Sequence, residues 1–179
     1  MVKTIAVAVV LLLIVVVGTV LAYAATKPDV FRVQRTASIK APPEKIFPLI
    51  NDFRSWGSWS PYEHKDPAMK KTYSGASAGK GAVYEWDGDK NVGSGRIEIA
   101  DTAPPNKVMI KLDMIKPFAA HNNVEFRLEP KGDTTDVTWA MNGQTPYMAK
   151  ILHVFLDMDR MVGQDFEVGL ASLKTVAEK

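Results

Sequence analysis

The sequence predicts an α+β fold: a curved antiparallel sheet of about seven strands wrapped on a long C-terminal helix. Two short helices are expected after the first strand, and an N-terminal transmembrane helix before it. Three observations lead to this prediction. An uncharged apolar stretch lies near the N-terminus, short alternating segments fill the middle of the chain, and apolar residues recur every three or four positions from Thr145 onward. Strands followed by a covering helix are typical of α+β proteins.

The apolar stretch Ile5–Ala25 contains 21 residues and no charge. A helix needs about 20 such residues to cross a bilayer. We therefore interpret residues 1–25 as an uncleaved anchor. The alternative is a cleaved signal peptide with Ala22-Tyr23-Ala24 as its cleavage site, although the apolar run is longer than the roughly 7–15 residues of a signal core. Lys3 lies on one side and Lys27 on the other, so the charges orient the helix only weakly. We expect the C-terminal domain on the extracytoplasmic side.

A linker at residues 26–29 leads into the first predicted strand, "VFRVQRTASIKA". Six further strands are expected in "MKKTYSG", "GAVYEWDG", "GSGRIEIADT", "NKVMIKLDMI", "NNVEFRLEP" and "TDVTWAMNG". Gly, Asn, Asp and Pro separate these segments, which predicts antiparallel hairpins. In the later strands apolar and polar residues alternate, so one face of the sheet is expected to be buried and the other wet.

Two helical segments complete the prediction. "PEKIFPLINDF" has helical spacing and begins with Pro43, whereas Pro48 is expected to shorten or kink it. Trp56 and Trp59 follow in a broken segment. The second segment is a helix of roughly 30 residues with Thr145 as its N-cap and Pro146 in its first turn.

Composition excludes several classes of protein. Cysteine is absent, so there is no disulfide framework and no thiolate nucleophile. Beyond residue 25 the chain has 21 basic and 20 acidic residues, whereas a nucleic-acid-binding protein is expected to show a basic excess. The three histidines, His64, His121 and His153, lack metal-ligand spacing. We therefore predict no nucleic-acid partner, no metal, no cofactor and no catalytic residue set.

The acidic residues Asp157, Asp159, Asp165 and Glu167 lie on the predicted C-terminal helix. Most acids on an amphipathic helix face solvent. Asp159 adjoins the apolar stripe, so we expect it to anchor a strand, to pair with an arginine such as Arg96, or to meet the polar head of a ligand.

The order of elements and several short motifs resemble the SRPBCC superfamily. The motifs are "APPEKIF", "WGSWSP", "YEWDG", "VGSG" and the terminal "MDRMVGQDFEVGLASLK". This is the helix-grip fold of polyketide cyclase/dehydrase-like proteins, START lipid-transfer domains and the major birch pollen allergen, and the chain looks like its membrane-anchored bacterial members. The resemblance covers residues 30–179 and implies a hydrophobic cavity between sheet and helix, with Trp56 and Trp59 near its end as core filling or as a lid.

The resemblance and the apolar pattern together predict the residues that line this cavity. They are Tyr84, Trp86, Ile97, Ile110, Leu112, Met114, Phe126, Trp139, Met141, Phe155, Met158, Asp159, Val162 and Phe166. Aromatic and methionine side chains form adaptable apolar surfaces. The expected function is therefore that of a membrane-tethered protein that binds a hydrophobic small molecule or lipid. The alternatives are a polyketide cyclase/dehydrase-type enzyme and a non-catalytic stress or interaction module; protein partners are undetermined.

Overall fold

The computed structural model describes residues 2–179, which form two compact units. The first, here called the helical unit, comprises the chain through Phe31 and the segment Gln144–Met158. The second, the sheet unit, comprises Arg32–Gly143 and Asp159–Lys179. Each unit is therefore built from two stretches that are distant in sequence.

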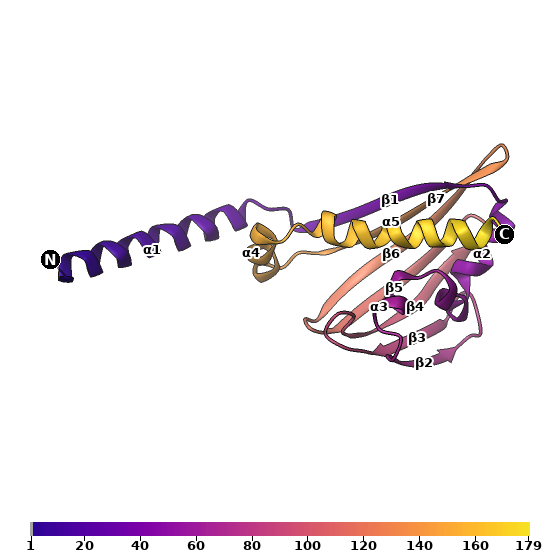
Figure 1. Ribbon diagram of the computed structural model, residues 1–179, viewed down its shortest axis with the longest axis horizontal. Coiled ribbons are helices and arrows are strands. Elements are labelled where there is room, and N and C mark those ends of the chain that lie inside the picture. The colour runs from indigo at the N-terminus through magenta and orange to yellow at the C-terminus, as the bar shows by residue number, and fades with distance from the viewer. Residues whose placement is uncertain (1) are drawn as a thin grey trace. The chain divides into compact units, whose positions relative to one another are not determined.

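The helical unit contains α1 (Val2–Ala25) and α4 (Tyr147–Phe155), drawn at the indigo and light-orange parts of Figure 1. Within residues 2–179, α1 is the one helix long and apolar enough to cross a membrane. Its 24 residues extend over about 36 Å at 1.5 Å per residue. Ala24 is the only residue of α1 that is buried. The predicted apolar helix is thus present and begins three residues earlier than Ile5.

The sheet unit is built on a seven-stranded sheet in the order β1-β7-β6-β5-β4-β3-β2. Neighbouring strands from β2 to β7 pair antiparallel. The strands are β1 (Val30–Ile39), β2 (Lys70–Gly75), β3 (Ala82–Asp87), β4 (Ser94–Ala103), β5 (Lys107–Lys116), β6 (Ala120–Lys131) and β7 (Thr134–Gln144). Each contains a segment in which the sequence predicts a strand, and the α+β class is confirmed.

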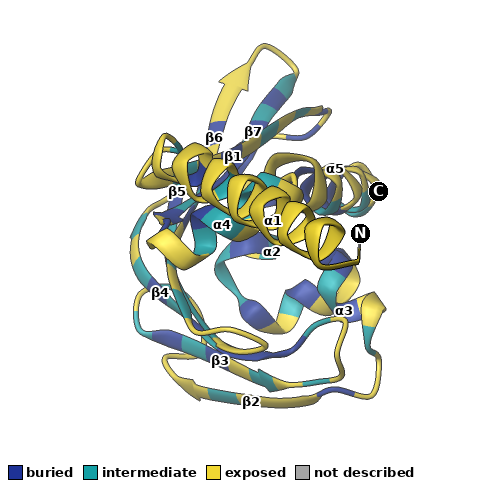
Figure 2. Ribbon diagram, turned by 90° about the vertical axis from the view of Figure 1, so that its left-hand side faces the viewer, coloured by how far each residue is buried: buried dark blue, intermediate teal, exposed yellow. Residues whose placement is uncertain are grey.

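Helix α5 (Met158–Ala177) packs on one face of the sheet, which we call the inner face (Figure 1). Its buried positions recur every three or four residues, as expected of an amphipathic helix. Phe166 stacks on Trp139 of β7, with ring centroids 4.1 Å apart. More and less buried positions alternate along much of β3 to β7, because one face of the sheet meets the helix and the other meets water. Figure 2 colours the chain by this burial.

Three short helices lie between β1 and β2: α2 (Pro43–Asn51), the 3₁₀-helix η1 (Phe53–Ser58) and α3 (Pro61–Lys65). Pro43 occupies the first turn of α2, where a missing N–H does no harm. The Asp52 side chain accepts a hydrogen bond from the Arg54 N–H and so caps η1. The sequence predicts two short helices here; the structure adds the 3₁₀-helix that carries Trp56.

The predicted continuous helix from Thr145 is wrong, because it is divided into α4 and α5. Leu156 has extended backbone angles, so helical hydrogen bonding stops there and resumes at Met158. Thr145 is not the N-cap of α4 either. Thr145 is buried, and its backbone N–H donates to the Asp29 carbonyl oxygen at 2.7 Å, while Pro146 stands at the N-cap position.

Candidate functional site: the inner face of the sheet

The inner face becomes more exposed from one end of the strands to the other. Strand register aligns Val108, Phe126 and Trp139 in one row, and all three are at most 3% exposed. The opposite row, formed by Trp86, Gly95, Met114 and Ala120, contains three half-buried residues. Of the two rows between them, the one with Ile110 is buried and the other is intermediate. In the intermediate row Tyr84 and Ile97 are buried, whereas Leu112 and Asn122, in register with them, are half-buried. The inner face thus has a closed end and a partly open, largely apolar end.

Two tryptophans fill the closed end. The Trp59 ring lies 6.0 Å from that of Phe126 and 5.7 Å from that of Trp139, and Trp59 is fully buried. Trp56 also contacts Phe126, at 6.2 Å. The indole N–H groups donate to backbone carbonyls of α2, from Trp56 to Ile50 and from Trp59 to Leu49. Because both side chains are buried and both indole N–H groups have partners in α2, the pair belongs to the core of the sheet unit.

Trp139 differs from these two tryptophans. Its indole nitrogen is buried and has no hydrogen-bond partner among residues 2–179. A buried donor without an acceptor lowers stability by about 1–3 kcal/mol. Stacking on Phe166 and close ring contact with Phe126, at 4.9 Å, hold the ring in place.

Trp86 forms the inner surface at the open end. Its side chain lies over Gly95 of the neighbouring strand: a Cβ atom on Gly95 would come within 2.6 Å of Trp86 Cζ2. The indole N–H donates to the Val92 carbonyl at 3.2 Å, which fixes the orientation of the ring. A fixed, half-buried indole therefore presents apolar surface beside Leu112 and Met114.

A buried carboxylate lies against the β2–β3 side of the inner face. Glu63 of α3 accepts hydrogen bonds from the Tyr84 hydroxyl at 2.7 Å and from the Lys71 ammonium group. Burial, and then the bond to Glu63, raises the pKa of Tyr84 far above its ordinary value. The phenol therefore stays protonated at neutral pH. This cluster joins α3 to the β2–β3 hairpin. Each carboxylate oxygen of Glu63 already has a hydrogen-bond partner, so the cluster offers no unused acid or base.

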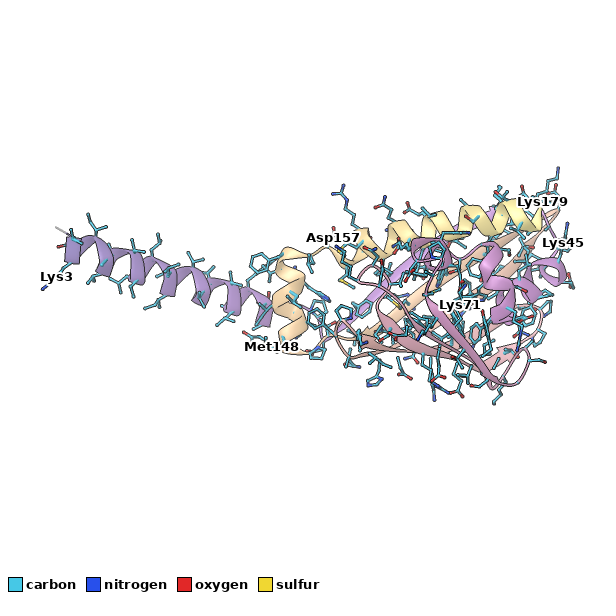
Figure 3. All side chains as sticks on the ribbon, turned by 60° about the horizontal axis from the view of Figure 1, so that its bottom comes forward. Lys3, Lys45, Lys71, Met148, Asp157 and Lys179 are labelled. Carbon is cyan, nitrogen blue, oxygen red and sulfur yellow. The ribbon has the colours of Figure 1, made fainter. Side chains whose placement is uncertain are left out.

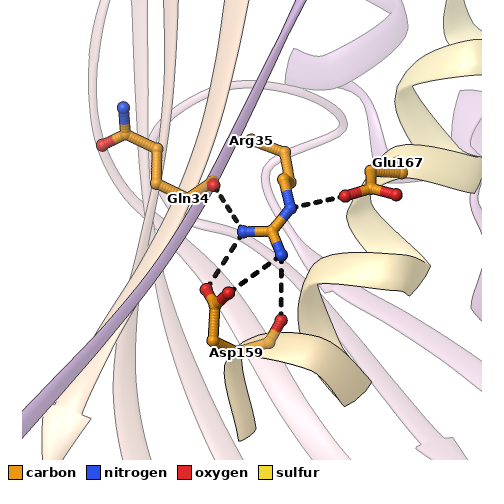
Figure 4. A network of polar contacts seen from close by, with 4 residues as sticks. All are labelled: Gln34, Arg35, Asp159 and Glu167. Atoms are coloured by element: carbon orange, nitrogen blue, oxygen red, sulfur yellow. Dashed lines mark hydrogen bonds and ion pairs between the residues drawn. The ribbon is translucent and has the colours of Figure 1, made fainter.

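A second polar cluster joins β1 to α5 (Figure 4). Arg35 shares the phase of Val33 and Ile39, both buried, and therefore points to the inner face. Its guanidinium makes five hydrogen bonds, one for each N–H: three to Asp159, one to Glu167 at 2.6 Å and one to the Gln34 carbonyl at 2.8 Å. The bonds to Arg35 lower the pKa of Asp159. No donor of Arg35 is left for a ligand.

Gly163 of α5 allows the Arg35 guanidinium to come close to the helix. A Cβ atom at Gly163 would overlap Nη2 and Cζ of Arg35, so the guanidinium passes directly over the helix at this position. Glycine lowers helix stability by about 1 kcal/mol relative to alanine, and here it provides the space for the ion pair.

The structure brings most of the predicted lining residues to the inner face or to the helix that covers it. Tyr84, Ile97, Ile110, Phe126, Trp139, Met141 and Phe166 are buried, and Trp86, Leu112, Met114, Met158 and Val162 are half-buried. Asp159 anchors strand β1, which is one of the three roles expected for it, and its partner is Arg35. The arginine named in the prediction, Arg96, pairs instead with Glu98 at 2.8 Å.

Phe155 requires a correction. It is 70% exposed and belongs to α4, so it is not the buried wall residue that a continuous helix predicted. Sequence reasoning missed Arg35 and Glu63. The alternation along β1 puts Arg35 on the same side as Val33 and Ile39, so the sequence does indicate that Arg35 faces inward. Nothing in the sequence around Glu63 distinguishes it from a surface acid.

Neither of the two polar clusters contains a histidine. His121 is exposed, and its Nδ1 lies 2.6 Å from an oxygen of Asp113. Within residues 2–179 no three His, Asp or Glu side chains gather as metal ligands would. A depression of about 550 Å³ lies away from the inner face, among the loops around Ala41, Pro105 and Pro130; Glu44 and Asp133 are its ionisable residues. We assign it no role.

Comparison with known proteins agrees with the fold. Residues 30–178 match the family model described as "Polyketide cyclase / dehydrase and lipid transport". No curated protein matches the sequence. Among solved structures, the Aha1 dimer from Colwellia psychrerythraea has a TM-score of 0.59 at 16% identity, over 83% of this chain and 96% of that one. The major latex-like protein 151 of Panax ginseng has a TM-score of 0.59 at 12% identity, over 85% and 100%. Protein CV1439 from Chromobacterium violaceum gives 0.58 at 14%, over 85% and 99%.

Proposed function

Because the chain belongs to the polyketide cyclase/dehydrase and lipid transport family, we propose that it binds a hydrophobic small molecule or lipid on the inner face, beneath α5, without transforming it. The observation that carries the proposal is the exposure gradient. Apolar side chains in register with a closed core become half-buried toward Trp86, Leu112 and Met114. A ligand that covers half-buried apolar surface stabilises the complex by about 25 cal/mol for each Å² removed from water.

The polar groups favour binding over catalysis. General acid–base catalysis needs a group within hydrogen-bond reach of the substrate and with a pKa near the working pH. Tyr84 and Lys71 both donate hydrogen bonds to Glu63, and every N–H of Arg35 is occupied. The cyclase/dehydrase-type alternative would require one of these clusters to open.

We place the protein at a membrane through α1 as an uncleaved anchor, with the sheet unit on the extracytoplasmic side. The length of α1, about 36 Å, exceeds the roughly 30 Å of the hydrocarbon core. Apart from Ala24, its residues are exposed or half-buried. An apolar surface of this size is unfavourable in water and favourable in lipid.

Three tryptophan substitutions on β5 test the binding site. Leu112→Trp fills half-open space, so stability should hold while bound ligand is displaced. Ile110→Trp overpacks a site that is 2% exposed and should lower the free energy of unfolding by about 1–3 kcal/mol. Lys111→Trp faces outward on the same strand and serves as the matched control.

The readout is native mass spectrometry of the full chain, with the stability of each variant taken from a thermal melt. The wild type and Lys111→Trp should retain co-purified lipid that Leu112→Trp has lost. Equal lipid adducts on Leu112→Trp and Lys111→Trp, with both variants folded, would contradict the proposed site.

A further inference from the structure

Helix α4 exposes its apolar side chains and buries its lysine, which is the opposite of a helix on the surface of a soluble protein. Its apolar side chains point to the surface: Met148 is 72% exposed, Leu152 45% and Phe155 70%. These positions follow the spacing i, i+4, i+7 and therefore form one helix face. The buried residue of α4 is a lysine, Lys150, at 8% exposure. Figure 3 labels Met148 at one end of this helix.

The polar side chains of α4 are held by the segment that follows α1. The Lys150 ammonium group lies 2.6 Å from a carboxylate oxygen of Asp29, and the backbone carbonyl of Asp29 accepts the Thr145 N–H. The His153 ring packs edge-on against Phe31, with centroids 6.3 Å apart. These contacts fix the rotation of α4, so the apolar face is turned outward by the helical unit itself.

The position of α4 along α1 matches the boundary of a bilayer. The Tyr147 hydroxyl donates to the Leu21 carbonyl at 2.9 Å, and Leu21 lies four residues, or about 6 Å, before the end of α1. Amphipathic helices at membranes sink about 5–10 Å into the region between headgroups and acyl chains. Tyr23, which is exposed and has the Lys27 ammonium 4.7 Å above its ring, has the chemistry of an interfacial residue at the same level.

We propose that α4 is a second membrane-contact element, with Met148, Leu152 and Phe155 buried in lipid at the bilayer surface. This inference rests on the proposed insertion of α1. Lipid is favoured over a protein occupant because α4 is hydrogen-bonded to the last turns of α1, the helix proposed to lie in the membrane. The membrane would then hold the protein at two places that are far apart in sequence.

The absence of cysteine allows a direct test in the full chain, because each single cysteine introduced carries the only label. A nitroxide is attached at Phe155→Cys, and at Met148→Cys as a second site, in phosphatidylcholine vesicles. Val15→Cys, in the middle of α1, reports on the anchor, and Glu129→Cys, an exposed residue of β6, reports on water. Collisions with molecular oxygen, which is enriched in lipid, are compared with collisions with a water-soluble nickel complex.

We expect oxygen to dominate at Phe155→Cys, Met148→Cys and Val15→Cys, and the nickel complex to dominate at Glu129→Cys. A lipid-like signal at Val15→Cys with water-like signals at both α4 sites would overturn the inference and leave the anchor intact. A water-like signal at Val15→Cys would instead overturn the anchor itself. Spin–spin broadening at both α4 sites would show that a second copy of the chain covers this face and would also refute the inference.

Discussion

At the scale of single residues, Arg35 explains how α5 is held against the edge strand of the sheet. The side chain satisfies each of its five N–H groups, and both carboxylate oxygens of Asp159 accept from it. Such bidentate pairs fix orientation as well as distance. The arrangement depends on Gly163, because any larger residue would occupy the volume of the guanidinium.

We predict that Gly163→Ala has opposite effects in two backgrounds. In the wild type the new methyl group overlaps Arg35 and should lower the melting temperature. In an Arg35→Ala background the overlap is absent, and the same substitution should raise stability by up to about 1 kcal/mol through helix propensity. Thermal melts of the four chains measure this. Equal effects in both backgrounds would show that Arg35 does not pass over Gly163.

At the scale of elements, the sequence predicts strands well because alternation reports directly on a sheet with one wet face. Val108, Ile110 and Leu112 alternate with Lys107, Met109 and Lys111; the inward set is wholly apolar, and the outward set is charged apart from Met109. The inward phase of β1 contains Arg35, a half-buried residue that hydrophobicity alone does not mark as inward-facing.

The division between α4 and α5 lies beyond such reasoning. Apolar residues continue at helical spacing through Phe155, Met158 and Val162, so the pattern predicts one helix. Tertiary contacts decide otherwise: Lys150 pairs with Asp29 and Asp159 pairs with Arg35, and these attachments belong to different units. Spacing along a helix shows which residues share a face but not what that face contacts. The pattern therefore predicts a buried environment for Phe155, whose side chain is exposed in the structure.

For α5 itself, we predict that Gly169→Ala is destabilising although alanine is the better helix former. A Cβ atom there would lie 2.7 Å from Trp139 Cζ3 and 2.9 Å from Pro61 Cδ. Overpacking by about one methyl group costs about 1–3 kcal/mol, which exceeds the propensity gain of about 1 kcal/mol. Chemical denaturation measures the difference, with Val168→Ala, on the exposed side of α5, as the control. A gain in stability would mean that the helix can move away from Trp139.

At the scale of the whole molecule, the chain combines a sheet domain typical of its family with a helical unit that exposes apolar surface. The match to the family model begins at residue 30, after α1. The match therefore includes the sheet unit and α4, whereas the function of α1 has to be inferred from its own chemistry.

We predict that the full chain stays in the membrane fraction after extraction with alkaline carbonate, because α1, inserted as proposed, would bury about 20 apolar residues in lipid. Mass spectrometry of the extracted protein should find residues 1–25 still attached. A soluble chain that begins near Ala25 would show instead that the helix is a cleaved signal. A variant with Leu13→Arg and Val16→Arg, which places two charges in the middle of α1, should weaken retention and serves as the control.

The two-part construction of the helical unit has a consequence for biosynthesis. Leu21 and Tyr147, which are hydrogen-bonded in the finished protein, are 126 residues apart in sequence. Ribosomes add about 5–20 residues per second, so α4 leaves the ribosome roughly 6–25 s after the end of α1. An α1 inserted during translation reaches the bilayer before its partner helix has been made. If α4 lies on lipid as proposed, it then completes its unit on a surface that is already in place, so Met148 and Phe155 need no protein partner once they emerge.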